Sequence, residues 1–169
     1  MTATRDKPKR APKSPAFGLA GRIQTPNSRP RSIALVGLGE GGAAIARAIG
    51  AERAPNLEVH VLAKSAGGDN ALAAIQAGGG DLQRGLMSAD MIFIVARRGD
   101  DVGLAPVVSS IAHSRKHPVT ALYIVPPEAV SGDDATLRTL RESVEMLVVV
   151  SDESYVPAMI AALGPGANE

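Results

Sequence analysis

The chain has 169 residues, a length that indicates one domain rather than several. Its formal net charge is +1. It contains no cysteine, so a disulfide, a thiolate metal site and a cysteine nucleophile are all excluded. Aromatic residues make up 2% of the chain, so we expect a core of Val, Ile, Leu and Ala. No apolar run approaches the roughly 20 residues that span a bilayer, and the basic N-terminus lacks the apolar region of a signal peptide. We therefore expect a cytoplasmic protein.

The N-terminal stretch differs in charge from the rest of the chain. Residues 1–32 hold eight Lys and Arg and one acid, Asp6, so their net charge is +7. The remainder holds ten basic and sixteen acidic residues, and its net charge is −6. Five prolines before residue 32 disfavour regular structure, and few large apolar side chains offer core contacts. We expect residues 1–31 to be a disordered basic tail, which either contacts an acidic partner or only aids solubility. Residues 32–169 would form the single folded domain.

A glycine-rich turn follows the short apolar run from Ile33 to Val36. The glycines at positions 37, 39 and 42 match the pattern G-x-G-x-x-G, and a helix is expected over residues 41–50. In such a turn the glycines allow a tight bend and a close approach of phosphate, and the helix N-terminus offers free N–H groups. The alternative is a strand-to-helix turn that binds nothing. The residues expected at this site are Gly37, Gly39, Glu40, Gly41 and Gly42.

Strand and helix patterns alternate along the rest of the chain. Apolar runs predict strands over residues 33–36, 58–63, 90–96, 119–125 and 146–150. Helical patterns lie between and after them, over residues 41–50, 69–77, 81–87, 104–116, 133–144 and 154–163. The alternation predicts a three-layer, Rossmann-like α/β fold with a doubly wound parallel sheet of about five strands, in the order 2-1-3-4-5. Ligands of such sheets bind outside the carboxyl ends of the strands, here between the first and third strands.

The loop after the third strand, residues 97–103, lies at that crevice. Arg97 or Arg98 could grip a phosphate as a bidentate fork. Asp100 or Asp101 could hold a ribose hydroxyl or a Mg²⁺ ion bound to phosphate. The alternative is a solvated loop that pairs with itself. The residues expected at this second part of the site are Arg97, Gly99, Asp100, Asp101 and Gly103.

In this order of pieces the chain resembles the nucleotide-binding half of FtsZ, the tubulin-like cell-division GTPase of bacteria. The similarity runs from about Ile33 to Leu163. The pieces that carry it are the glycine turn, Ser88 to Ile94, Ala105 to Val108, Val119 to Pro126, and Arg138 to Ser154. The resemblance implies a nucleotide-binding fold and GTP or GDP as ligand.

The chain also departs from that family. The family's phosphate loop is G-G-G-T-G-T-G, whereas the matching stretch here is Gly99-Asp100-Asp101-Val102-Gly103. Threonine hydroxyls are absent, and carboxylates repel a triphosphate unless a metal or an arginine intervenes. The sequence also offers no counterpart of the family's second half, which carries the water-activating loop. We therefore expect a non-catalytic nucleotide-binding or protein-interaction module, with no GTP hydrolysis.

Two other functions remain open at this point. An NADP-binding oxidoreductase domain would use the same glycine turn, and Lys64 at the end of the second strand would suit a 2′-phosphate. A scaffold with a relict pocket is the third hypothesis. The three histidines lack ligand-like spacing, so no metal site is expected. A protein partner is expected, and the patterns decide neither its identity nor whether the chain forms a homo-oligomer.

Overall fold

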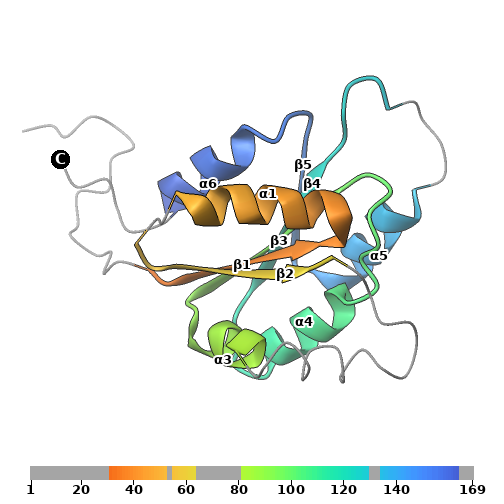
Figure 1. Ribbon diagram of the computed structural model, residues 1–169. Coiled ribbons are helices and arrows are strands. Elements are labelled where there is room, and N and C mark those ends of the chain that lie inside the picture. The colour runs from red at the N-terminus through yellow and green to blue at the C-terminus, as the bar shows by residue number, and fades with distance from the viewer. Residues whose placement is uncertain (1–30, 53–54, 64–80, 130–133, 164–169) are drawn as a thin grey trace, which may run out of the picture.

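Five parallel strands form one sheet in the order β2-β1-β3-β4-β5 in the computed structural model of the chain (Figure 1). The structure describes residues 31–52, 55–63, 81–129 and 134–163. The strands are β1 (Ile33–Leu38), β2 (Leu57–Leu62), β3 (Met91–Arg97), β4 (Val119–Ile124) and β5 (Met146–Val150). The predicted fold class and strand order are thereby confirmed.

Helices cover both faces of the sheet. They are α1 (Gly39–Ala51), α3 (Asp81–Ser88), α4 (Ala105–His113), α5 (Ala135–Ser143) and α6 (Tyr155–Leu163). Helices α1 and α6 lie on one face, and α3, α4 and α5 lie on the other (Figure 1). Within the described residues, no helix has the length and apolar character that crossing a membrane requires.

The central strands are apolar on both sides because both sides face helices. All six residues of β1 are buried, as are five of the seven residues of β3. Alternate side chains of these strands enter two separate cores, one with α1 and α6 and one with α3, α4 and α5. The strands at the two edges of the sheet are less buried, and Met146 and Val149 of β5 are more than half exposed.

The boundaries of the first two elements differ from the prediction. Strand β1 continues to Leu38 instead of ending at Val36, and α1 begins at Gly39 instead of Gly41. The reason is that Gly37 still pairs with β2 and β3 on its two sides. Gly39, with φ of +69°, then turns the chain directly into the helix, a conformation that favours glycine. Helix α4 ends at His113, earlier than expected, and the predicted helix over 69–77 lies outside the described residues.

Helix α3 packs on β2 through a contact between Gly85 and His60. A Cβ atom at Gly85 would lie 2.3 Å from Nε2 of His60, so only glycine allows this approach. The His60 side chain is 10% exposed, and its Nε2 has no hydrogen-bond partner and lies 3.4 Å from Oε1 of Glu58. Burial lowers the pKa of His60, although the nearby carboxylates of Glu58 and Asp81 act in the opposite direction.

Stability should therefore fall on mild acidification. In the unfolded chain His60 takes up a proton near its ordinary pKa of 6.5, whereas the folded protein holds it neutral to a lower pH. The unfolded state then binds more protons, so the free energy of unfolding decreases as pH falls from 7 through 6.5 toward the folded pKa. Denaturant unfolding at pH 7, 6 and 5 measures this slope, and His60→Gln should reduce it. An unchanged slope in the variant would show that other groups cause the dependence.

Candidate functional site

The glycine turn and the loop of residues 97–103 meet at the carboxyl ends of β1 and β3. These two strands are neighbours in the sheet, with Gly37 of β1 paired to Val95 of β3. The chain leaves β1 into α1 and leaves β3 into the loop, so the N-terminus of α1 faces the loop. This is the crevice that the strand order predicts as the ligand site of such a sheet.

The side chain of Asp100 occupies the N-terminus of α1. Its Oδ1 accepts a hydrogen bond from the backbone N–H of Gly41 at 2.9 Å, and its Oδ2 accepts one from Gly42 at 2.8 Å. Oδ2 also accepts from the backbone N–H of Arg97 at 2.7 Å. The two carboxylate oxygens thus take the N–H groups that a phosphate was expected to bind. A carboxylate at this place is also favoured by the partial positive charge of the helix N-terminus.

Glycine is required around this carboxylate because Asp100 lies so close to the turn. A Cβ atom at Gly39 would lie 2.4 Å from Cβ of Asp100, and one at Gly41 would lie 2.9 Å from its Oδ2. Gly42 faces the sheet instead, where a Cβ atom would lie 2.2 Å from the carbonyl oxygen of Val95. Gly37 faces α1, where a Cβ atom would lie 2.5 Å from the carbonyl oxygen of Gly42. The glycine pattern therefore reflects close approaches to Asp100, to β3 and to α1.

The loop that carries Asp100 is held from both ends. Its backbone turns at Gly99, which has φ of +84°, and the N–H of Asp100 donates to the carbonyl of Arg97 at 3.0 Å. The hydroxyl of Thr136, at the start of α5, donates to the carbonyl of Asp100 at 2.9 Å. Further along, the Asp101 carboxylate accepts from the N–H of Gly103 at 3.0 Å. Because these contacts fix the backbone, the Asp100 side chain is directed at α1.

Arginines 97 and 98 pair with acids of the protein itself. The Arg97 guanidinium forms an ion pair with Glu153, which precedes α6. The Nε of Arg98 lies 3.8 Å from Oδ2 of Asp134, the residue whose Oδ1 caps α5 at Leu137. Both guanidinium groups therefore lie beside carboxylates of the protein, and neither is an unpaired bidentate donor for a phosphate.

A buried tyrosine joins the same group of polar residues. The Tyr123 side chain is fully buried on β4, and its hydroxyl donates to Oδ2 of Asp134 at 2.5 Å. Burial raises the pKa of Tyr123 above its ordinary value, and the hydrogen bond to Asp134 raises it further. Asp134, the N-cap of α5, therefore also satisfies a buried hydroxyl that would otherwise lack a partner.

The crevice groups some of the predicted site residues and separates others. Gly39, Gly41, Gly42, Arg97 and Asp100 lie in one connected cluster. Gly37 lies inside β1, Glu40 is exposed in the first turn of α1, and Lys64 lies outside the described residues. Gly99, Asp101 and Gly103 line a shallow hollow of about 470 Å³ between the loop and the start of α5, together with Asp100, Val102, Asp134, Ala135, Thr136 and Thr139.

The chemistry of that hollow is acidic and hydroxylic. The described residues that line it include Asp100, Asp101 and Asp134 but no lysine or arginine. The carboxylate of Asp100 is hydrogen-bonded to α1, and that of Asp134 to Tyr123 and Leu137. Among the described residues, no group of three His, Asp or Glu side chains is arranged to hold a metal ion. The hollow therefore favours a hydroxyl-bearing or cationic group over a phosphate, because like charges repel across short distances.

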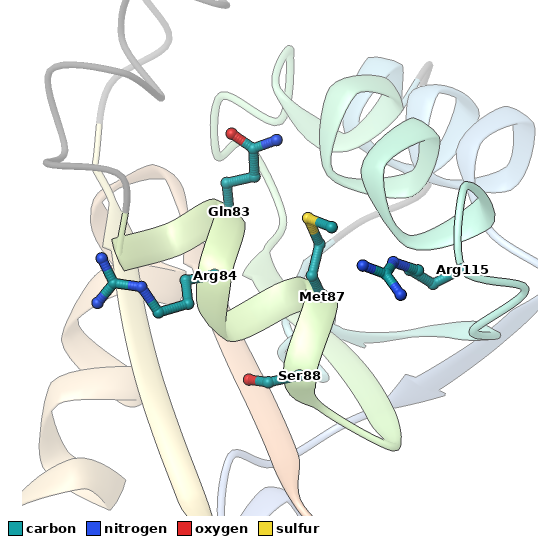
Figure 2. A pocket seen from close by; sticks show the side chains of 5 residues that line it. All are labelled: Gln83, Arg84, Met87, Ser88 and Arg115. Atoms are coloured by element: carbon teal, nitrogen blue, oxygen red, sulfur yellow. The ribbon is translucent and has the colours of Figure 1, made fainter.

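A second hollow, of about 480 Å³, lies between α3 and the segment that follows α4 (Figure 2). It is lined by side chains of α3 and of the segment after α4, namely Gln83, Arg84, Met87, Ser88 and Arg115. In Figure 2 the Arg84 guanidinium lies on the side of α3 away from Arg115, whereas the Arg115 guanidinium extends toward Met87, and Arg84 pairs with Asp81 at 3.0 Å. The two guanidinium groups therefore do not converge on one ligand position, and the glycine turn remains the better candidate site.

Two contacts of the site were not predicted from the sequence. Thr136 was not selected because a threonine in the first turn of a helix is common and its partner lies 36 residues earlier. Glu153 lies in a stretch that carries the resemblance, but its pairing with Arg97 depends on the positions of β3 and β5 in the sheet. Neither a scan of protein-family models nor a search of curated proteins finds a match to this chain.

Proposed function

We propose that this chain is a non-catalytic protein-interaction module with an FtsZ/tubulin-like nucleotide-binding architecture, in which its own Asp100 replaces the nucleotide phosphate. The observation that carries the proposal is the set of hydrogen bonds from Gly41, Gly42 and Arg97 to the Asp100 carboxylate. An anion already held by the chain stabilises the turn without a ligand. A nucleotide would have to displace it and then lie beside its charge.

The electrostatics of the crevice support the same proposal. The residues around the turn and the hollow supply the carboxylates of Asp100, Asp101 and Asp134, while Arg97 is paired with Glu153. Phosphoryl-transfer chemistry needs cations or donors aimed at the phosphate oxygens. Here the donors are already used by Asp100, and so the loop lacks free groups that would stabilise a transferring phosphoryl group.

A nucleotide-binding module is the second candidate, and the intact turn favours it. The glycines and the N-terminus of α1 keep the geometry that accepts a phosphate, so movement of the Asp100 side chain alone would expose two N–H groups. GTP or GDP, with Mg²⁺, would be the ligand in that case. NADP would be the ligand of an oxidoreductase-type domain.

Calorimetry and thermal unfolding with GTP, GDP and NADPH test this proposal. We expect no shift in the melting temperature of the wild type at 1 mM of any nucleotide, with Mg²⁺ present. The variant Asp100→Gly, alone or with Asp101→Gly, should bind a phosphate-bearing ligand several-fold more tightly, since removing a close charge is worth on the order of 1 kcal/mol. Adding Gly41→Val to Asp100→Gly should abolish that gain, because the branched side chain fills the freed space.

The matched control is Asp101→Gly alone, which removes an equal charge one residue away from the turn. It should leave nucleotide binding close to that of the wild type. Tight binding raises the free energy of unfolding by about 2.7 kcal/mol at a hundred-fold excess over Kd. A wild-type protein that gains stability of this size with one nucleotide would contradict the closed turn and favour the second candidate.

A further inference from the structure

An apolar groove with acidic ends runs along α1 on the face of the sheet that α1 and α6 cover. Its volume is about 470 Å³. Ala44, Ile45, Ala48 and Ile49 of α1 form one wall, and Pro157 of α6 lies opposite. Ala44 and Ala48 are exposed, whereas Ile45 and Ile49 are buried beneath them, and covering the exposed apolar surface would lower the free energy.

The ends of this groove carry a net negative charge. Glu52 lies at the end near the C-terminus of α1, and Asp152 and Glu153 lie at the other end, before α6. Arg97, the one basic residue among the described residues that line the groove, already pairs with Glu153. A segment that fits the groove should therefore combine apolar side chains with basic ones.

The N-terminal tail of the same chain has that chemistry. Residues 1–31 carry eight Lys and Arg against one acid, and their large apolar residues after Met1 are Phe17, Leu19 and Ile23, with Arg22 among them. The groove is acidic and the tail is basic, so the two are complementary in charge. The tail also has apolar side chains that can cover the apolar residues of the groove.

The tail also joins the sheet close to one end of the groove, where Glu52 lies. The N–H of Ile33, the first residue of β1, donates to the carbonyl of Asn56 at 2.8 Å, in the connection that follows Glu52. The start of β1 and the end of α1 lie at the same edge of the molecule (Figure 1). From Glu52 to Ala44 the groove follows α1 for roughly 12 Å at 1.5 Å per residue. The chain between Ile23 and Ile33 spans up to about 33 Å when extended, so the tail can reach the whole groove.

From these observations we infer that residues 16–24 of the tail bind in the groove between α1 and α6 of their own chain, with Phe17, Leu19 and Ile23 on its apolar floor. The segment needs no fold of its own for this, since a short extended peptide can use a preformed groove. The groove would then be a regulated surface, because a partner that binds there has to displace the tail. This inference does not depend on whether the glycine turn binds a nucleotide.

Disulfide trapping in the full chain tests it, on a background that contains no native cysteine. Leu19→Cys with Ala48→Cys places one thiol on the segment and one in the groove, and a glutathione buffer lets the pair reach equilibrium. Leu19→Cys with Ser110→Cys is the matched control, because Ser110 is an exposed small residue on α4, in the other helical layer. We expect the intramolecular disulfide in the groove pair to be at least ten-fold more favoured than in the control pair.

Two further measurements test the inference: the effect of reversing the charges of the groove, and whether the disulfide forms within one chain or between two. Glu52→Lys with Asp152→Lys, added to the groove pair, should lower the trapped fraction several-fold, and high salt should do the same because it screens exposed charges. Equal trapping in the groove and control pairs would overturn the inference. A disulfide that joins two chains, seen as a dimer on a non-reducing gel at low protein concentration, would also overturn it and assign the groove to the tail of a second copy. Trapping unaffected by the lysine variant would refute the charge complementarity on which the assignment depends.

Discussion

Gly42→Ala should be among the most destabilising single changes in the described part of this protein. The new Cβ atom would lie 2.2 Å from the carbonyl oxygen of Val95 in the central strand β3, and a strand backbone between two neighbours cannot withdraw. Overpacking against backbone costs about 3 kcal/mol or more. The melting temperature should fall by roughly 10 °C for a domain of this size, as measured by circular dichroism.

Gly50→Ala in the same helix is the control for that experiment. Its Cβ atom would lie 3.2 Å from Cγ2 of Val59, a side-chain atom that can shift by a few tenths of an ångström. Alanine is preferred over glycine by up to about 1 kcal/mol in a helix, and Gly50 lies in the last turn of α1, so the net effect should be small. If Gly42→Ala proved as mild as Gly50→Ala, the close packing of α1 on β3 would be wrong.

Asp100→Ala should destabilise the protein by about 2 kcal/mol, because three backbone N–H groups lose a charged acceptor. Asp101→Ala, which removes a carboxylate that accepts a hydrogen bond from Gly103 in an exposed loop, should cost well under half of that. Urea unfolding of both variants measures the difference. It tests the internal role of Asp100 independently of any nucleotide.

Sulfate provides a second readout of the same contact. In Asp100→Ala the vacated N–H groups of Gly41 and Gly42 should accept an oxyanion, so sulfate should recover part of the lost stability. The Asp101→Ala variant and the wild type should show only the general stabilisation that sulfate gives to proteins. Equal responses of all three proteins, or a loss at Asp101 as large as at Asp100, would contradict the assignment of Asp100 as the internal anion.

The sequence predicts the architecture of this protein because the pattern of each element is strong. The apolar runs of β1 and β3 have helices on both faces, and such runs read as strands of a parallel sheet. Regular alternation then leaves few topologies, since crossovers are right-handed and short. The switch point between β1 and β3 follows from the strand order, so the location of the crevice was predictable as well.

The occupant of the glycine turn could not be predicted in the same way. Glycines in this pattern allow a phosphate to approach, and they equally allow the approach of Asp100. Which of these happens depends on the curvature of the loop, which Gly99 and the contact from Thr136 determine. Those contacts join residues far apart in the chain, and local patterns carry no information about them. The repulsion expected between Asp100 and a phosphate stays a prediction, and the hydrogen bonds of Asp100 to the turn were not foreseen.

The position of β1 in the sheet also determines the order in which the protein can fold during synthesis. β1 pairs with β2, the next strand to leave the ribosome, and with β3, which is made much later. When the β1–α1–β2 unit has been synthesised, the edge of β1 that later pairs with β3 is still unpaired. The face of β1 that α3, α4 and α5 later cover is still exposed. Parallel pairing between distant segments is slow and leaves apolar edges exposed meanwhile. We therefore expect the nascent chain to expose the unpaired edge of β1 until β3 has been synthesised.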